Sequence, residues 1–173
     1  MKTNKIKTRD LVMLAVYAAL FITIELVQNQ FGLFKMPNGG SLSVSAVVLL
    51  LASYHLGYKK GIAISLISVI LQFITGDMFL GTGIFGFFLD YVLAYGIYGI
   101  ASIFPNYKYL YTGVIITNLI RYISSTISGM IFYKTNLIGS LSYNATYMIP
   151  TTLIAIVLVP LLHQRMKKIN LMK

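Results

Sequence analysis

Two ionisable side chains lie deep within apolar segments of this sequence. Asp90 lies in the run GTGIFGFFLDYVLAYGIYGI (81–100), and Arg121 lies in the run TGVIITNLIRYISSTISGMIF (112–132). A charge at the centre of a bilayer costs about 2.5–3.5 kcal/mol on insertion scales, so such a residue normally faces a protein interior or a water-filled cavity. Asp90 therefore either forms a structural ion pair with Arg121 or holds a positively charged ligand.

The composition indicates an integral membrane protein. Hydrophobic residues make up 57% of the 173 residues and charged residues only 10%, with a mean hydropathy of +0.79. This exceeds what a soluble core of this size can bury. We expect a single transmembrane domain over residues 1–173, with no metal or cofactor. The absence of cysteine excludes disulfides and thiolate metal sites.

Six segments are long and apolar enough to cross a bilayer, which takes about 20 residues. The predicted spans are residues 10–30, 41–57, 60–76, 82–104, 110–133 and 142–163.

The distribution of basic residues predicts the orientation of these spans. With the N-terminus inside, eleven Lys and Arg residues fall in the inner connections and ends, while only Lys35 and Lys134 fall outside. This bias predicts an all-α bundle of six transmembrane helices, multi-pass in the cell membrane, with both termini cytoplasmic. In a soluble protein the net charge of +10 would suggest a nucleic-acid partner, but the distribution of the basic residues follows the membrane orientation, so we expect none. The basic ends fit attraction to anionic membrane lipid or docking onto a cytoplasmic partner.

Helical spacing gathers small and polar residues on one face of each of the last four spans. These faces are Gly61, Ser65, Ser68 and Gln72; Gly83, Gly86, Asp90 and Ala94; Asn118, Arg121, Ser125 and Ser128; and Ser140, Asn144, Tyr147 and Thr151. Residues of this kind also pack helices together in membranes. Asp90 lies about 12 Å below the outer end of its span at 1.5 Å per residue, so the converging faces favour a pocket that opens outward.

Three tyrosines flank the last predicted outer loop, namely Tyr133, Tyr143 and Tyr147. A tyrosine ring can stack on a flat heteroaromatic ring or hold a cation, so together with Asp90 they suit a small, flat, positively charged ligand. Glu25, near the outer end of the first span, is interpreted as a solvated rim residue, with ligand contact as the alternative.

Ala15 and Ala19 form a small-xxx-small face on the first span, which permits close approach of another helix. The spacing alone does not separate packing inside the bundle from docking to another subunit.

The sequence contains no HExxH motif, paired carboxylates, Ser–His–Asp set or Walker motif. We therefore expect no enzyme activity and no nucleotide hydrolysis by this chain. The rival interpretations are a self-sufficient carrier or channel, with Asp90 and Arg121 as an ion relay, and a small membrane enzyme.

Several stretches resemble the thiamine-specific substrate-binding (S) components of energy-coupling factor (ECF) vitamin transporters, over nearly the whole length. They are MPNGGSLSV (36–44), LGYKKG (56–61), FLDYVLAYGIYGIA (88–101), IRYISSTISGMIFY (120–133) and SLSYNATYMIP (140–150).

The resemblance implies six helices around a vitamin pocket near the outer face, closed by the loop between the first two helices. In that loop we expect Pro37, Gly39 and Gly40 to form a tight turn and Ser41 to cap the second helix. The implied partners are thiamine, a transmembrane coupling subunit and two ATPase subunits. The AxxxA pattern of Ala15 and Ala19 matches the family's contact with the coupling subunit.

The resemblance also assigns positions in the pocket. The family's acidic ligand-binding position falls on Asp90, the asparagine of its YN motif on Asn144, and an aromatic position on Tyr133. Two positions depart from the pattern, since Ser125 replaces a usual histidine and Gly139 replaces a tyrosine. A site built for polar groups discriminates strongly when such partners change, so a related or smaller cationic heterocycle is the alternative ligand.

The sequence thus predicts a subunit that captures thiamine from outside without catalysis, in a pocket between the fourth, fifth and sixth helices. The predicted substrate-binding residues are Asp90, Arg121, Ser125, Tyr133, Tyr143, Asn144 and Tyr147.

Overall fold

The computed structural model describes residues 7–32, 35–37, 39–75, 78, 81 and 83–169. Within these residues, the regular secondary structure is helical except for one two-stranded hairpin. The long helices are α1 (Thr8–Phe31), α3 (Tyr58–Thr75), α6 (Thr112–Phe132), α7 (Leu137–Lys168) and a composite helix over Gly83–Ile103, and α2 (Ala46–Leu56) is short. The composite helix consists of α4 (Gly83–Phe87), the π-helix η1 (Phe88–Leu93), α5 (Ala94–Gly96) and the 3-10 helix η2 (Ile97–Ile103).

Five helices in the described part of the chain are long and apolar enough to cross a membrane: α1, α3, the composite helix, α6 and α7. They correspond to five of the six predicted spans. The remaining predicted span, residues 41–57, is helical only over the 11 residues of α2. At 1.5 Å per residue α2 is about 16 Å long, which is about half of the hydrocarbon thickness of a bilayer.

Residues 41–45 do not join α2 because side chains of other helices satisfy their backbone groups. The backbone N–H of Ser43 donates to Thr151 Oγ1 at 3.1 Å, and that of Ser45 donates to Gln28 Oε1 at 3.1 Å. Gln28 Nε2 in turn donates to the carbonyl oxygen of Leu42 at 2.8 Å. This segment is therefore held in a non-helical conformation between α1 and α7 and enters the bundle before α2 begins.

The turn before this segment confirms one prediction and corrects another. Gly39 and Gly40 have φ angles of 87° and 86°, and the N–H of Met36 donates to the Gly40 carbonyl oxygen at 2.9 Å. The predicted tight turn is therefore present. The prediction that Ser41 caps the second helix is wrong, because the N-cap residue of α2 is Ser45.

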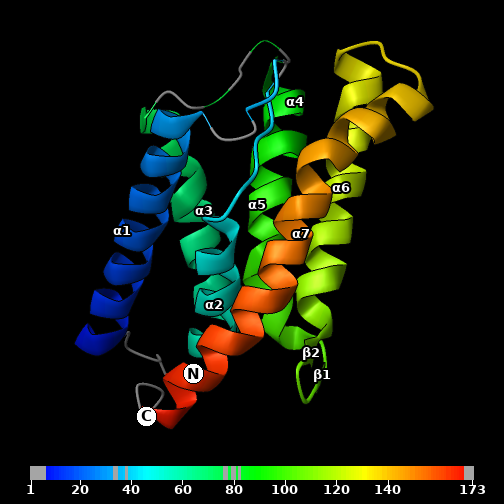
Figure 1. Cartoon of the computed structure of the whole chain (residues 1–173). Coiled ribbons are helices and arrows are strands. Elements are labelled where there is room, and N and C mark those ends of the chain that lie inside the picture. Colours follow the sequence, from blue (N-terminus) through cyan, green and yellow to red (C-terminus); the bar gives the residue numbers. More distant parts are fainter. Residues whose placement is uncertain are drawn as a thin grey trace, which may run out of the picture.

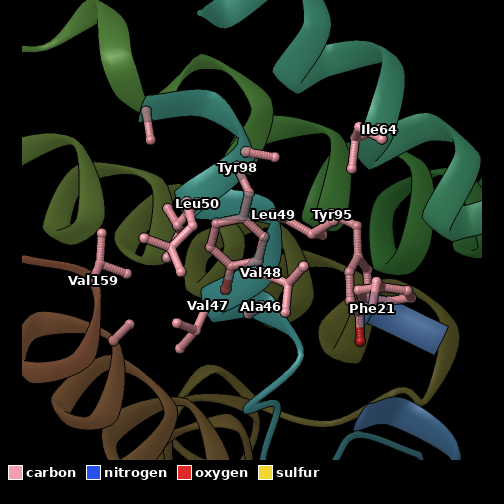
Figure 2. Packing of buried hydrophobic residues seen from close by; sticks show 14 of the residues in the cluster. Phe21, Ala46, Val47, Val48, Leu49, Leu50, Ile64, Tyr95, Tyr98 and Val159 are labelled. Carbon is pink, nitrogen blue, oxygen red and sulfur yellow. The ribbon is translucent and has the colours of Figure 1, made fainter. Parts of the chain in front are cut away.

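The helix α2 lies at the centre of the bundle, with all eight residues from Ala46 to Ser53 buried. Figure 2 shows Leu49 and Leu50 of α2 among side chains of the surrounding helices, including Tyr98. A helix that is apolar all round belongs in a core, and the run AVVLLLA has this property.

The two ends of the bundle carry different kinds of connection (Figure 1). At the lower end in this view, α1 begins, α7 ends, and the strands β1 (Asn106–Tyr107) and β2 (Leu110–Tyr111) form a hairpin that the sequence did not predict. At the upper end lie the connections from α1 to α2 and from α6 to α7. The described basic residues at the start of α1 (Lys7 and Arg9) and at the end of α7 (Arg165, Lys167 and Lys168) therefore lie at the lower end, whereas Lys35 and Lys134 lie in the upper connections.

Two glycines allow α3 to approach the composite helix closely. A Cβ atom added to Gly61 would lie 2.5 Å from the carbonyl oxygen of Gly99, and one added to Gly99 would lie 2.5 Å from the backbone N of Ile62. Such distances are shorter than van der Waals contact and involve backbone atoms, which cannot move independently. The packing of α3 on η2 therefore depends on the missing side chain at both positions.

We expect Gly99→Ala to lower the free energy of unfolding by about 1–3 kcal/mol, the usual cost of overpacking. Thermal unfolding of the purified protein in detergent measures this effect. Gly96→Ala in the same helix is the control, since its Cβ would meet only Leu66 Cδ2 at 3.9 Å. Equal stability of the two variants would contradict the proposed backbone contact.

Candidate functional site

A cavity of about 390 Å³ lies at the upper end of the bundle, a volume within the range of small-molecule sites. Its walls come from α1, the turn at residues 35–41, α3, η1, α5, α6 and α7. The structure brings together on this cavity all the residues predicted to bind substrate, namely Asp90, Arg121, Ser125, Tyr133, Tyr143, Asn144 and Tyr147.

The polar faces predicted from helical spacing point into the protein. All four residues of the predicted face are buried on α3, on α6 and on α7. On the composite helix Gly86 and Ala94 are buried and Asp90 is half-buried, whereas Gly83 is exposed. The prediction that these faces converge is confirmed for all but the first turn of the fourth predicted span.

Asp90 lies in the π-helix η1 and lines the cavity. Its Oδ2 atom accepts a hydrogen bond from Ser128 Oγ of α6 at 2.6 Å. Single π turns inside α-helices occur often at functional sites. Here the wider turn places Tyr95, five residues further on, on the same cavity wall as Asp90. Tyr95 is not among the predicted site residues, because regular α spacing puts it on a different face of the helix from Asp90.

Two tyrosines, rather than Asp90, hold the guanidinium of Arg121. Its Nη1 atom donates to the Tyr98 hydroxyl at 3.1 Å and its Nη2 atom to the Tyr95 hydroxyl at 3.3 Å. The guanidinium carbon lies 4.4 Å from the centre of the Tyr95 ring, within range of a cation–π interaction. Asp90 and Arg121 both belong to the described residues and form no salt bridge. The structural ion pair considered from the sequence is therefore not formed.

The start of α7 contributes two aromatic rings and an amide. The rings of Tyr143 and Tyr147 are arranged edge to face, with centroids 6.4 Å apart and an interplanar angle of 80°. The Tyr147 hydroxyl donates to Oδ1 of Asn144, and the Asn144 amide nitrogen donates to the carbonyl oxygen one turn earlier at 2.9 Å. Asn136 makes this start possible, because its side chain accepts from Gly139 N at 2.7 Å and caps the helix.

Tyr133 is the C-cap residue of α6 and begins the non-helical connection to α7. Burial, together with the negative charge of Asp90, raises the pKa of the Tyr133 hydroxyl above its ordinary value. The ring is therefore neutral at physiological pH and presents an uncharged aromatic face and hydroxyl to the cavity.

The glycine turn covers the upper part of the cavity and contacts α7 directly. The Tyr143 hydroxyl donates to the carbonyl oxygen of Gly39 at 2.9 Å. A Cβ atom on Gly40 would lie 2.6 Å from Cε1 of Tyr147. The absence of a side chain at Gly40 thus lets the turn rest against the Tyr147 ring.

Two further polar residues of α1 line the cavity. Glu25 is only 3% exposed and accepts a hydrogen bond from the Ser45 hydroxyl, so its interpretation as a solvated rim residue is wrong. The side-chain nitrogen Nδ2 of Asn29 and the Nε atom of Arg121 are buried and have no hydrogen-bond partner among the described residues. Buried donors without acceptors are costly, so these two atoms are candidates to donate to a ligand.

Ala15 and Ala19 do not line the cavity. Both are exposed on α1, next to the exposed apolar residues Leu11, Val16 and Leu20. This placement excludes the interpretation that the small-residue face packs inside the bundle.

The fold resembles that of a solved structure of ThiT from Listeria monocytogenes, with a TM-score of 0.70 and 15% sequence identity. The match covers 91% of this chain and 96% of that chain. The sequence is also 28% identical over 173 residues to the thiamine transporter ThiT of Bacillus subtilis (strain 168), with 88% of each chain covered.

A family model described as "Thiamine transporter protein" (Thia_YuaJ) matches residues 15–171. Together with the apolar helices, this match confirms the predictions of a multi-pass membrane protein and of a transporter rather than an enzyme. It also confirms the resemblance that the sequence motifs indicated. Because the match extends over most of its length, the chain belongs to the thiamine transporter protein family.

Proposed function

We propose that this chain is the substrate-binding component of an ECF-type importer and that it captures thiamine from outside the cell. The observation that carries the proposal is that one cavity, in a member of the thiamine transporter family, is lined by Asp90 and by the tyrosines Tyr133, Tyr143 and Tyr147. Thiamine offers matching chemistry, with a permanently charged thiazolium ring, a flat aminopyrimidine ring and a terminal hydroxyl.

Asp90 neutralises the charge of the thiazolium ring. Because Arg121 is held by Tyr95 and Tyr98, no salt bridge within the described residues cancels the negative charge of the carboxylate. Ser128 orients one carboxylate oxygen and leaves the other available to the ligand. In a partly buried site such an attraction is much stronger than in water.

The aromatic residues supply the flat contact surfaces. Tyr133, Tyr143 and Tyr147 come from two sides of the connection between α6 and α7, and all three line the cavity. A tyrosine ring stacks on a heteroaromatic ring or attracts a cation to its face, so this group can accommodate both rings of thiamine.

Donors and acceptors at the cavity wall select the polar atoms of the ligand. The Nε atom of Arg121 and Nδ2 of Asn29 can donate to pyrimidine nitrogens or to the hydroxyl oxygen. Asn144 and Ser125 provide further hydrogen-bonding groups. Ser125 and Gly139 stand where the family usually has a histidine and a tyrosine, so a related or smaller cationic heterocycle is the alternative ligand.

The topology that accompanies this function has six membrane segments, with α2 as the short second one, and both termini in the cytoplasm. The gathering of basic residues where α1 begins and α7 ends supports this orientation. The cavity then lies towards the outer face of the membrane.

A coupling subunit and two ATPase subunits complete the proposed importer. The exposed small-residue face formed by Ala15 and Ala19 supports this part of the proposal, because it offers another membrane helix a surface for close packing.

The first test replaces the carboxylate that faces the ligand. We expect Asp90→Asn to weaken thiamine binding at least tenfold, since hydrogen bonds to charged groups contribute about 1.5–3 kcal/mol. Isothermal titration calorimetry of the purified protein measures the affinity. Asp10→Asn is the control, because Asp10 bonds to Lys60 at 2.7 Å and is not among the cavity residues. Unchanged affinity in a folded Asp90→Asn protein would remove Asp90 from the site.

The second test concerns the glycine turn. We expect Gly40→Ala to lower thiamine affinity roughly tenfold, because the added methyl group overlaps the Tyr147 ring and displaces the turn. Gly32→Ala is the matched control, since Gly32 also has a positive φ angle but no atom lies within 4 Å of the position its Cβ would take. The same loss of affinity in both variants would show that contact with Tyr147 is not the cause.

The third test separates an importer subunit from a self-sufficient carrier. We expect liposomes with the purified chain alone to take up no thiamine, and liposomes that also contain the coupling subunit and both ATPases to accumulate it with ATP. In the complete importer, the double variant Ala15→Trp/Ala19→Trp should still bind thiamine but no longer take it up. The variant Leu26→Trp, at another exposed position of α1, should retain thiamine uptake. Uptake by the chain alone would instead support the carrier.

A further inference from the structure

A second cavity of about 390 Å³ lies at the opposite end of the bundle, between the hairpin and the last turns of α7. One part of its wall is apolar and consists of Ile156, Val157, Pro160 and Leu161. Val157 is 62% exposed and Leu161 53% exposed, whereas Pro160 is buried and Ile156 packs against the core, so the outer part of this wall faces away from the bundle. We call this cavity the hairpin groove.

The polar groups of the hairpin groove are confined to its lower end. Gln164, Arg165 and Lys168 follow the apolar residues along α7. From Ile156 to Lys168 the helix rises by about 18 Å, close to the thickness of one hydrocarbon leaflet plus its headgroup boundary. The groove thus passes from apolar to cationic over the same distance as a phospholipid passes from acyl chain to phosphate.

The hairpin supplies the facing wall and a further cation. Tyr109 lines the groove, is 62% exposed, and lies where an interfacial tyrosine is typical. Lys108 extends over the Tyr109 ring, with its ammonium group 5.3 Å from the ring centre. Arg165 and Lys168 therefore line the polar end and Lys108 lies beside the groove residue Tyr109, whereas Lys167 is not among the groove residues.

A proline leaves one carbonyl group of α7 without its usual helical donor in the apolar part of the groove. Pro160 has no N–H group, so the carbonyl oxygen of Ile156 cannot receive the usual hydrogen bond from the residue four positions later. Both residues line the hairpin groove.

We propose that the hairpin groove binds one anionic phospholipid. The phosphate lies among Arg165, Lys168 and Lys108, and an acyl chain lies along Val157 and Leu161. Basic pockets at the cytoplasmic side of membrane proteins bind anionic headgroups in this way. The proposal does not depend on which solute occupies the upper cavity, and it concerns a membrane lipid rather than a free phosphate.

The sequence contains no tryptophan, so Tyr109→Trp introduces a single tryptophan, which can be excited selectively, into the hairpin groove. We would reconstitute this protein in phosphatidylcholine vesicles that contain brominated phosphatidylglycerol or, at the same mole fraction, brominated phosphatidylcholine. Bromine quenches tryptophan only at close range. We expect the brominated phosphatidylglycerol to quench with an apparent affinity about fivefold or more above that of brominated phosphatidylcholine.

Matched charge changes distinguish a site from the general attraction of a basic surface. In the Tyr109→Trp background, Arg165→Gln/Lys168→Gln should abolish the preference for phosphatidylglycerol. Lys59→Gln/Lys167→Gln removes the same charge from exposed positions outside the groove and should keep it. Equal quenching by the two lipids, or equal loss in both double variants, would overturn the proposal.

Native mass spectrometry gives a second readout on the protein without the tryptophan. After extraction from mixed vesicles, we expect one phosphatidylglycerol molecule retained on the original chain. The Arg165→Gln/Lys168→Gln protein should lose it. The same retention on both proteins would also overturn the proposal.

Discussion

The charge of the cavity depends on how Arg121 is held. A guanidinium inside a helical bundle needs hydrogen-bond acceptors, and here the hydroxyls of Tyr95 and Tyr98 supply them. The Tyr98 hydroxyl itself donates a hydrogen bond to Asn118 Oδ1 at 2.8 Å, so the arrangement continues along the face of α6. Had Arg121 bonded to Asp90 instead, the carboxylate would have been neutralised within the protein. Two aromatic hydroxyls thus keep a cation and an anion apart on the wall of one cavity.

The segment at residues 41–45 makes the upper part of this cavity possible. Its backbone groups exchange helical hydrogen bonds for bonds to Gln28 of α1 and Thr151 of α7. This exchange shortens α2 but ties the first and last helices to one segment, which then carries the turn at Gly39 and Gly40 over Tyr147. The position of the turn is therefore fixed by side chains that are far from it in sequence.

The sequence predicts those features that depend on local spacing. The helical period of 3.6 residues was enough to identify the inward faces of α3, α6 and α7. A charged residue within an apolar run was enough to single out Asp90 and Arg121. The sequence could not reveal which partner Arg121 takes, because that depends on the relative rotation of two helices. Glu25 carried the same signal as Asp90 but was misassigned, since its burial depends on Ser45 in a segment expected to be helical.

The π turn at Phe88–Leu93 has a consequence for how such a cavity can change. In an α-helix each residue advances by about 100°, so one additional residue within a turn rotates everything beyond it by that amount. Removing a residue from this stretch would restore the regular period and swing Tyr95 away from the wall that it shares with Asp90. In this helix, the loss of a single codon therefore changes which side chains beyond the π turn face the cavity, which a substitution at one position does not do.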